Sequence, residues 1–286
     1  MDLYNLGLVS WWESQCYYHA LAYLGREGII ICRPSNPYVC LGIHDDLDQE
    51  IDRDFCQENG LPLLRRETAG GVVYLDSRQV FYQVILHKNN PYLPLKRIHF
   101  FPRILQPAID LYRSFGIDAL LVPPADIKAG GRKCSGNAAG DIGPSVVYVG
   151  NIIMDFDFEA MSKVLKVPTP TYRRHLLKAM QDHMLTLAGR MNGTDVQVLE
   201  LELVKGFERQ FGNLNCRSLD NEIKQQSVLL KERLTSKEWL NQPGRQSKLR
   251  RIKIAEGVYL REVRSDENKF ALALVQDGRV EGITIP

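Results

Sequence analysis

Two adjacent glycines, Gly130 and Gly131, follow the short run Asp126–Ala129 and precede a second β-like run. A double glycine between such runs predicts a tight hairpin, because glycine reaches the positive φ that these turns need. Lys133 then lies on a strand beside the turn, and the small residues of Ser135–Asn137 leave space next to its ammonium group. A lysine held in this way suits a carboxylate or phosphate oxygen. The same pattern also occurs in ordinary solvated hairpins.

A second segment, residues 65–76, reads Arg-Arg-Glu-Thr-Ala-Gly-Gly-Val-Val-Tyr-Leu-Asp. Gly70 and Gly71 allow the main chain to approach a ligand closely, because they carry no side chain. Arg65 and Arg66 precede them, and each guanidinium group offers several donors to an anion. The segment is not a P-loop, since no Gly-Lys-Ser/Thr follows, and it is not a dinucleotide fingerprint. It predicts either an anion-binding loop or an ordinary turn between two strands.

The two segments, in this order, resemble the lipoate–protein ligase family. The family pattern Arg-Arg-x-(Thr/Ser)-Gly-Gly-Gly-Ala-Val-Tyr-His-Asp is similar to residues 65–76. The later pattern Gly-(Arg/Lys)-Lys-x-(Ser/Ala)-Gly-(Ser/Asn)-Ala is similar to residues 131–138. A third element, His-His-Gly-(Thr/Ser)-Leu-Leu-Leu-Asp-x-Asp, corresponds to Tyr148–Asp157. The resemblance extends from about Asp2 to Trp239, and three ordered motifs are more specific than any one of them.

The chain departs from the family pattern at several positions. Ala69 replaces the first glycine of the triple, and Leu75 stands where many members have histidine. Tyr148 and Val149 replace the two histidines, and Ala125 replaces an asparagine before the hairpin. The lysine and both arginines are retained. The resemblance therefore still implies the fold, while rate, substrate preference and protein partner stay open.

The resemblance implies an ATP-dependent ligase that activates lipoate or octanoate as an acyl-adenylate and transfers it to a lysine of a lipoyl-domain protein. Lys133 is the expected catalytic residue, because one cation between a carboxylate and the α-phosphate offsets their repulsion. Asp126 is the expected ligand of Mg²⁺ or of a ribose hydroxyl. The residues expected to bind the acyl chain or its adenylate are Arg65, Arg66, Thr68, Gly70, Gly71, Val72, Tyr74, Asp126, Ser135, Gly136, Asn137, Ala138 and Gly150.

The expected small molecules are thus ATP, Mg²⁺ and lipoate. The expected protein partner is a lipoyl-domain acceptor. The glycine-cleavage H-protein, the acyltransferase subunit of a 2-oxoacid dehydrogenase and other lipoate-binding proteins all fit this description, and the sequence does not choose among them.

Two alternatives remain open. The first is an octanoyl or lipoyl transferase of the same fold that works through a cysteine thioester, which requires a thiolate facing the lysine. Cys134 follows Lys133 directly, but neighbours on a strand point to opposite faces, and Ser135–Asn215 contains no cysteine. The second is a biotin-type relative or a non-catalytic relative that binds lipoyl domains, and the altered Ala69, Tyr148 and Val149 positions would favour the non-catalytic relative.

Composition narrows the function class. The net charge of +2 argues against a strongly basic nucleic-acid surface. No apolar run is long enough to span a membrane. The six cysteines show no CxxC spacing, so a structural zinc site is not expected. Free thiols and the lack of a signal-peptide pattern at the N-terminus favour a cytoplasmic protein.

Mixed strands with interspersed helices predict an α+β fold. The resemblance implies the mixed sheet of biotin and lipoate ligases, covered by helices, with a small β-rich appendage at the C-terminus. We expect a catalytic domain over residues 1–240, a linker over Leu240–Ser247 and an accessory segment over residues 248–286. The apolar patterns further predict helices over Ser14–Leu24, Asp46–Asn59, Pro102–Phe115, Phe158–Val167, Met180–Arg190 and Val198–Phe211. They also predict that the strand Val72–Leu75 pairs with Val80–Leu86, and that Asp277-Gly278 forms a hairpin turn. Asp155 and Asp157 are expected to cap the helix that follows them.

Overall fold

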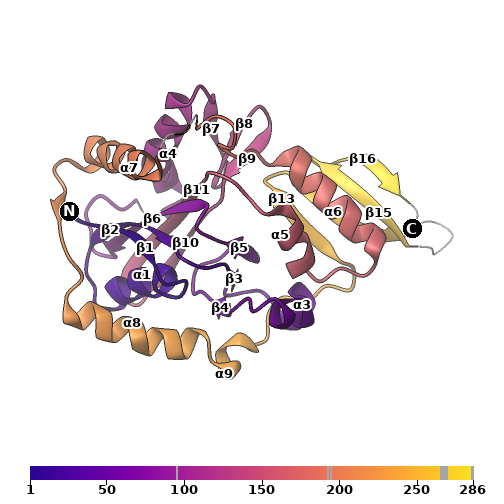
Figure 1. The fold of residues 1–286 in the computed structure, drawn as a ribbon, viewed down its shortest axis with the longest axis horizontal. Coiled ribbons are helices and arrows are strands. Elements are labelled where there is room, and N and C mark those ends of the chain that lie inside the picture. Colours follow the sequence, from indigo (N-terminus) through magenta and orange to yellow (C-terminus); the bar gives the residue numbers. More distant parts are fainter. Residues whose placement is uncertain (95, 192, 194, 265–269, 285–286) are drawn as a thin grey trace.

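A six-stranded mixed sheet forms the centre of the computed structural model (Figure 1), which describes residues 1–94, 96–191, 193, 195–264 and 270–284. The strand order is β10-β11-β6-β2-β1-β12. Strands β12, β1 and β2 run parallel, and β2, β6, β11 and β10 are antiparallel neighbours. The six strands are β1 (Asp2–Val9), β2 (Gly28–Pro34), β6 (Gln79–His87), β10 (Asn137–Ile142), β11 (Ser145–Ile153) and β12 (Asn215–Cys216).

Helices cover both faces of this sheet (Figure 1). Val80, Tyr82 and Val84 of β6 pack toward α4 and α7, whereas Phe81 and Ile85 pack toward α1 and α8. Successive strand residues face opposite sides, so a strand buried on both faces is apolar throughout. The covering helices are α1 (Glu13–Tyr23), α4 (Phe101–Ser114), α7 (Val196–Phe211) and α8 (Asn221–Leu234), with a 3-10 turn η1 (Arg97–Phe100) before α4.

Two small three-stranded sheets carry the two sequence motifs. The loop Arg66–Val72, here called the glycine loop, joins β4 to β5. Strands β8 and β9 form the predicted hairpin, here called the lysine hairpin, with Gly130 and Gly131 at φ values of +54° and +76°. The hairpin prediction is confirmed. The small sheets consist of β4 (Leu63–Arg65), β3 (Tyr38–Leu41) and β5 (Val73–Leu75), and of β7 (Ala119–Val122), β8 (Asp126–Ala129) and β9 (Arg132–Ser135).

Three local predictions are wrong. The segment Asp46–Asn59 forms two short helices because Asp46 caps the first and Asp52 caps the second. The predicted helix over Met180–Arg190 is also absent beyond His183. The predicted partners Val72–Leu75 and Val80–Leu86 do not pair, since β5 joins β3 while β6 joins β2 and β11. The remaining short and peripheral helices are α2 (Leu47–Glu50), α3 (Arg53–Glu58), α5 (Phe158–Val164), α6 (Pro170–His183) and α9 (Lys237–Leu240).

A four-stranded antiparallel sheet follows the main body. The predicted turn at Asp277-Gly278 is confirmed, with φ values of +48° and +81°. The sheet packs on α6 (Figure 1), where the Tyr172 hydroxyl donates to Leu260 O at 2.8 Å. Its apolar side chains share one buried cluster with β3, β5 and α6. The strands are β13 (Arg251–Ala255), β14 (Val258–Arg264), β15 (Phe270–Gln276) and β16 (Arg279–Thr284).

Within the described ranges no helix is long and apolar enough to cross a bilayer. The structure thus consists of one large mixed sheet with helices on both faces, two small sheets that present the motifs, and the C-terminal sheet. The predicted α+β class, with a mixed sheet covered by helices and a small β-rich C-terminal part, is confirmed.

Candidate functional site

Lys133 forms an ion pair with Asp126 across the lysine hairpin. Its Nζ lies 2.9 Å from Asp126 Oδ1, and the two side chains are 19% and 7% exposed. The main chain of Lys133 is also held, because Leu185 N donates to Lys133 O at 2.8 Å. A half-buried ammonium on a bonded strand is pre-positioned, so little conformational freedom has to be lost when it meets an anion.

Space beside this ammonium comes from Gly136. A Cβ placed on Gly136 would lie 3.6 Å from Lys133 Nζ and in contact with Asn151 Oδ1. The Gly136 N–H donates to Asn151 Oδ1 at 2.9 Å, and Asn151 Nδ2 donates to Gln79 Oε1 at 2.8 Å. Gln79 Nε2 in turn donates to Tyr74 O on β5 at 3.2 Å. These bonds connect the lysine hairpin to the strand that leaves the glycine loop.

Asn137 and Ser135 belong to a buried polar group under the hairpin. Tyr82 OH donates to Asn137 Oδ1 at 2.5 Å, and Asn137 Nδ2 donates to Ala125 O at 2.8 Å. Gly150 leaves room for this arrangement, since a Cβ there would overlap both Asn137 Oδ1 and the Tyr82 ring. The hydrogen bonds of Ser135 and Asn137 stabilise the position of the lysine hairpin on the central sheet. Ligand contacts of these two residues stay predictions.

The Arg66 guanidinium closes the glycine loop on itself. Its Nη1 donates to Cys40 O at 3.2 Å, and its Nη2 donates to both Ala69 O and Gly71 O at 3.0 Å. The residue is 6% exposed. Arg66 therefore shapes the loop through carbonyl groups, and a direct contact with a ligand anion stays a prediction.

Arg65 is fully buried and joins the loop to distant segments. Its Nη1 donates to Asp45 O at 2.7 Å, and its Nη2 donates to Leu240 O at 2.6 Å and to Gln242 O at 3.1 Å. Trp239 Nε1 donates back to Arg65 O at 2.9 Å. The guanidinium is thus committed to main-chain carbonyls, where it anchors the residues that follow α9.

Glu67 is clamped from two helices. Tyr23 OH on α1 lies 2.8 Å from Glu67 Oε2, and Arg233 on α8 forms an ion pair with the same carboxylate. The Arg233 guanidinium also stacks over the Tyr23 and Trp239 rings, each with its centroid 5.1 Å away. The entrance to the glycine loop is therefore rigid.

The loop tip contrasts with this entrance. Ala69, Gly70 and Gly71 are exposed, and Gly70 has a φ of +103°. A Cβ on Gly70 would lie 2.7 Å from Arg66 Nη2, whereas a Cβ on Gly71 would meet open space. Thr68 is fully buried and packs against Gly140 of β10, where a Cβ would lie 3.1 Å from Thr68 Cα.

Three further predicted residues differ in their surroundings. Val72 and Tyr74 are buried in the cluster shared with α5 and α6, so their side chains support the loop from within. Ala138 is half-buried and pairs with Val149 across β10 and β11. Tyr148 on the opposite face contacts the Phe100 and Phe101 rings. Of the two positions that replace the His-His pair, only Val149 therefore shares the face of the sheet on which Thr68 packs.

The carboxylate proposed to bind Mg²⁺ is already engaged on both oxygens. Asp126 Oδ1 pairs with Lys133, and Oδ2 accepts the Glu256 N–H at 2.7 Å. In the part of the chain that the structure describes, no three His, Cys, Asp or Glu side chains come together as a metal site. These residues do not fit a protein cage for Mg²⁺, and we derive no step from a protein-bound metal.

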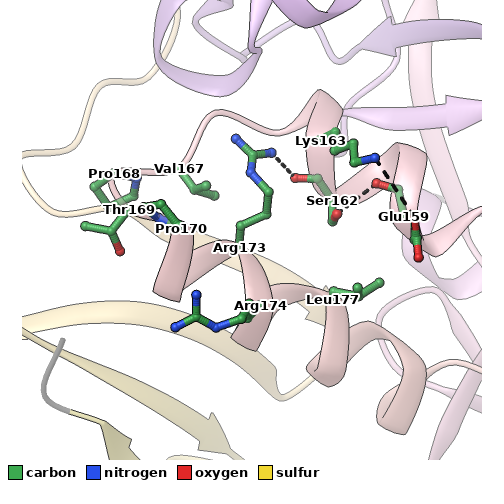
Figure 2. A pocket seen from close by; sticks show the side chains of 10 residues that line it. All are labelled: Glu159, Ser162, Lys163, Val167, Pro168, Thr169, Pro170, Arg173, Arg174 and Leu177. Atoms are coloured by element: carbon green, nitrogen blue, oxygen red, sulfur yellow. Dashed lines mark hydrogen bonds and ion pairs between the residues drawn. The ribbon is translucent and has the colours of Figure 1, made fainter.

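Two cavities of about 460 Å³ lie apart from both motifs. Figure 2 shows the first, between α5 and the start of α6, with Arg173 reaching across to Ser162. Arg173 Nη1 donates to Ser162 O at 2.5 Å, and Lys163 lies 4.0 Å from Glu159. None of the lining residues belongs to the glycine loop or the lysine hairpin. The candidate site is thus defined by the contacts of the two motifs and not by either of these cavities.

A family model for the lipoyl protein ligase A/B catalytic domain matches residues 12–208. The chain belongs to this family. The lipoate–protein ligase of Streptococcus pyogenes serotype M5 is 33% identical over 137 residues, which are 46% of this chain and 38% of that protein. Lipoate-protein ligase A subunit 1 of Thermoplasma acidophilum is 24% identical over 70% of this chain and 79% of its own length.

Proteins named octanoyltransferases are also similar to this chain. Octanoyltransferase LipM of Geobacillus kaustophilus is 23% identical over 60% of this chain and 70% of that protein. The chain spans less than half the length of several curated lipoate ligases that it matches, between 38% and 49% of four of them.

Solved structures share the fold of this lipoyl protein ligase A/B family member. The bipartite lipoate protein ligase of Thermoplasma acidophilum, studied with its E2 lipoyl domain, superposes with a TM-score of 0.73 at 19% identity. It covers 86% of this chain and 98% of its own. A lipoate-protein ligase A bound with ATP superposes with a TM-score of 0.67 at 20% identity, over 84% of this chain and 98% of its own.

Several residues that form hydrogen bonds or ion pairs with the two motif segments were not predicted from the sequence. They are His19, Tyr82, Gln79, Asn151 and Arg233, which contact residues 65–76 or 131–138 from α1, β6, β11 and α8. Asn151, a polar residue within an apolar run, was an available signal. Nothing in the sequence placed Arg233, because its partner lies 166 positions earlier.

Proposed function

We propose that this protein is an ATP-dependent lipoate–protein ligase. It activates lipoate or octanoate as an acyl-adenylate and transfers the acyl group to a specific lysine of a lipoyl-domain protein. The observation that carries the proposal is the partly exposed Lys133 ammonium, which an ion pair with Asp126 holds on a bonded strand next to Gly136, a residue without a side chain. Relatives that bear the name lipoate–protein ligase support the same activity.

The chemistry requires two anions to meet, because a carboxylate oxygen must attack the α-phosphorus of ATP. Pyrophosphate leaves with the electron pair of the broken P–O bond, and the acyl-adenylate remains. In this proposal Lys133 lies between the two anions. It then lies beside the negative charge that develops on the acyl carbonyl oxygen when the acceptor amine attacks, before AMP leaves with the electron pair of the broken C–O bond. The glycine loop presents an exposed main chain at Gly71 against which the adenylate can lie.

The positive charge of Lys133 is already partly neutralised by the carboxylate of Asp126. In the structure the two form a pair, so an incoming anion competes with Asp126 for the ammonium. Mg²⁺ in this proposal enters with the phosphates of ATP, as is usual for an ion that binds few protein ligands. Lys133 then recognises the acyl-phosphate part beside Gly136, and Arg66 maintains the loop that faces it.

The cysteine-thioester alternative is disfavoured by the surroundings of the thiols. Burial raises the pKa of the Cys134 thiol to about 12, and its Sγ lies against Ile127 O at 3.4 Å on the core side of the hairpin. Burial raises the pKa of the other four buried thiols as well. A protonated thiol is a poor nucleophile.

Cys216 is the exposed cysteine. It lies on β12, at the edge of the central sheet opposite to β10. Five strand spacings separate the two edges, or roughly 24 Å. This cysteine is therefore badly placed to exchange an acyl group with the lysine hairpin.

Mass spectrometry of a lipoyl domain tests the proposal. One reaction contains lipoate, ATP and Mg²⁺, a second omits ATP, and a third replaces lipoate and ATP with an octanoyl thioester of a carrier protein. We expect acylation in the first reaction only. Acylation in the third reaction alone would establish the transferase activity, and binding of the lipoyl domain without any acylation would establish the non-catalytic relative. The same reactions with the lipoyl domain of an H-protein and with that of a 2-oxoacid dehydrogenase acyltransferase show which of the two is the acceptor.

A further inference from the structure

The turn between β13 and β14 touches the lysine hairpin through one residue of its main chain. Glu256 N donates to Asp126 Oδ2 at 2.7 Å, and Glu256 O accepts from Lys128 Nζ at 2.6 Å. Asp126 and Lys128 are two positions apart on β8, and such residues face the same side of a strand. The C-terminal sheet, beside β8 and β9 in Figure 1, thus contacts the hairpin on the side that carries these charged groups.

The contact with Glu256 affects two lysines that lie close to the Asp126 carboxylate. Lys128 and Lys133 are direct partners across β8 and β9, and like charges at such positions repel. Glu256 O holds the Lys128 ammonium, which leaves the Asp126 carboxylate to Lys133. Without this main-chain acceptor, Lys128 would compete for the same carboxylate.

The second oxygen of Asp126 is fixed by the same turn. Asp126 is 5% exposed, so its oxygens need partners inside the protein. The Glu256 N–H occupies one oxygen and thereby orients the other toward Lys133 Nζ. The side chain of Glu256 takes no part, because its Oε2 pairs with Lys253 at 2.5 Å.

We propose that the Glu256–Gly257 turn of the C-terminal sheet is a positioning element for Lys133, which acts through Asp126. The inference rests on the proposed function, in which Lys133 meets the reacting anions. The turn touches neither substrate nor the reacting atoms. It sets the direction of the carboxylate, and the carboxylate sets the position of the ammonium. A segment outside the span matched by the family would then influence the rate of adenylate formation.

Glu256→Pro removes the donating N–H with little disturbance of the turn. Glu256 has a negative φ and Gly257 a φ of +76°, and a type II turn has these signs of φ at its two central positions. Proline is favoured at the first central position of that turn, and the preceding Ala255 is already in a strand. Glu256→Ala is the matched control, because it keeps the N–H and removes only the side chain.

We expect Glu256→Pro to lower kcat for adenylate formation by about tenfold, since small misplacements of a catalytic group cost this much or more. KM for lipoate and for ATP should change less than twofold. Glu256→Ala should retain the wild-type kcat. A purely structural role would instead lower the melting temperature and leave kcat of the folded protein unchanged.

A second measurement needs no turnover. Mass spectrometry after brief treatment with an amine-acylating reagent reports how well the Asp126 pair protects Lys133. Glu256→Pro should increase labelling of Lys133 relative to Glu256→Ala. If wild-type protein makes no adenylate, the proposed function fails, while this comparison still decides whether the turn positions Lys133.

A double-mutant cycle tests whether the effect passes through Asp126. In an Asp126→Asn background, adding Glu256→Pro should change kcat and labelling little, because coupled residues are not additive. Should Glu256→Pro fold poorly, Gly257→Ala displaces the turn instead, because Gly257 has a φ of +76° and a Cβ there would overlap Asp277 Oδ1. We expect it to lower kcat and increase Lys133 labelling. Wild-type kcat and labelling in the folded variants would overturn the inference, as would additive effects in the cycle.

Discussion

The ring of His19 joins helix α1 to the glycine loop, because its Nε2 accepts the Glu67 N–H at 3.2 Å. The other ring nitrogen donates to Gln15 O at 2.8 Å, so both nitrogens are committed in the neutral form. The side chain is fully buried, and burial lowers the pKa of His19 from its usual 6.5 to about 3. Protonation would remove the acceptor for Glu67.

The folded protein should therefore lose stability as the pH falls below about 6.5. The unfolded chain binds a proton on His19 from that pH downward, whereas the folded chain stays neutral until about pH 3. Between pH 7.5 and pH 5 this group should remove about 2 kcal/mol of the free energy of unfolding. Urea titrations at both pH values measure the loss. His19→Gln should reduce it, while the same substitution at exposed His44 should leave it unchanged.

Lys133→Met should lower the rate of adenylate formation by about 10²–10³, because a positioned donor to developing charge is lost. It should also destabilise the protein by about 2 kcal/mol, since Asp126 is left buried without its cation. Adding Asp126→Asn should restore the melting temperature without restoring turnover. A single variant with wild-type turnover would remove Lys133 from the mechanism. Lys133→Arg should also fail, because its planar fork does not replace a compact ammonium.

The two exposed glycines of the loop should respond differently to substitution. Gly70→Ala should lower the free energy of unfolding by about 1–3 kcal/mol, because its φ is +103° and the new Cβ approaches Arg66. Gly71→Val should leave the melting temperature nearly unchanged, because a Cβ there meets open space. It should nevertheless raise the lipoate or ATP concentration needed for activity. Calorimetric titration of the folded Gly71→Val protein decides the point, and unaltered affinity would mean that the loop is only a turn.

Replacing the thiols should have little effect on ATP-dependent acylation. Cys134→Ser keeps a donor for Ile127 O, and Cys216→Ser changes an exposed position on β12. We expect both variants to keep at least about half of wild-type activity, in line with substitutions that leave the reacting groups untouched. A trapped acyl-thioester on wild-type protein, together with an inactive serine variant, would instead establish a thioester route.

Local conformation was the part of the structure that the sequence predicts best. The turns at Gly130-Gly131 and Asp277-Gly278 follow from positive φ values, which short-range sequence determines. Asp157 caps α5 as expected, accepting from Ala160 N at 2.8 Å. Asp155 differs, since it lies 3.4 Å from Arg78 in an ion pair. The predicted helix over Asp46–Asn59 fails for an equally local reason, because its second cap at Asp52 starts a new helix.

Contacts between residues far apart in the sequence could not be predicted from the sequence. Val72–Leu75 has an acceptable sequence for a strand, but its choice of β3 as partner depends on the whole sheet. The arginine pair illustrates the same limit within the site. A sequence shows that Arg65 and Arg66 can donate, whereas only the fold shows that main-chain carbonyls accept most of these bonds. The ligand contacts of both arginines therefore stay predictions, and the fold alone shows which of their donors are already used inside the protein.

Trp239 and Leu240 give a practical meaning to the span of residues 12–208 that the family model matches. Both lie beyond this span, yet they exchange hydrogen bonds with Arg65 at the base of the glycine loop. A recombinant fragment that ends at residue 208 would leave the buried Arg65 guanidinium without two of its hydrogen-bond acceptors. It would also remove the helices that hold the base of the glycine loop. Boundaries drawn from similarity alone would thus cut through the scaffold of the site. Chimeras with other ligases should exchange α8 and α9 together with the loop that they hold.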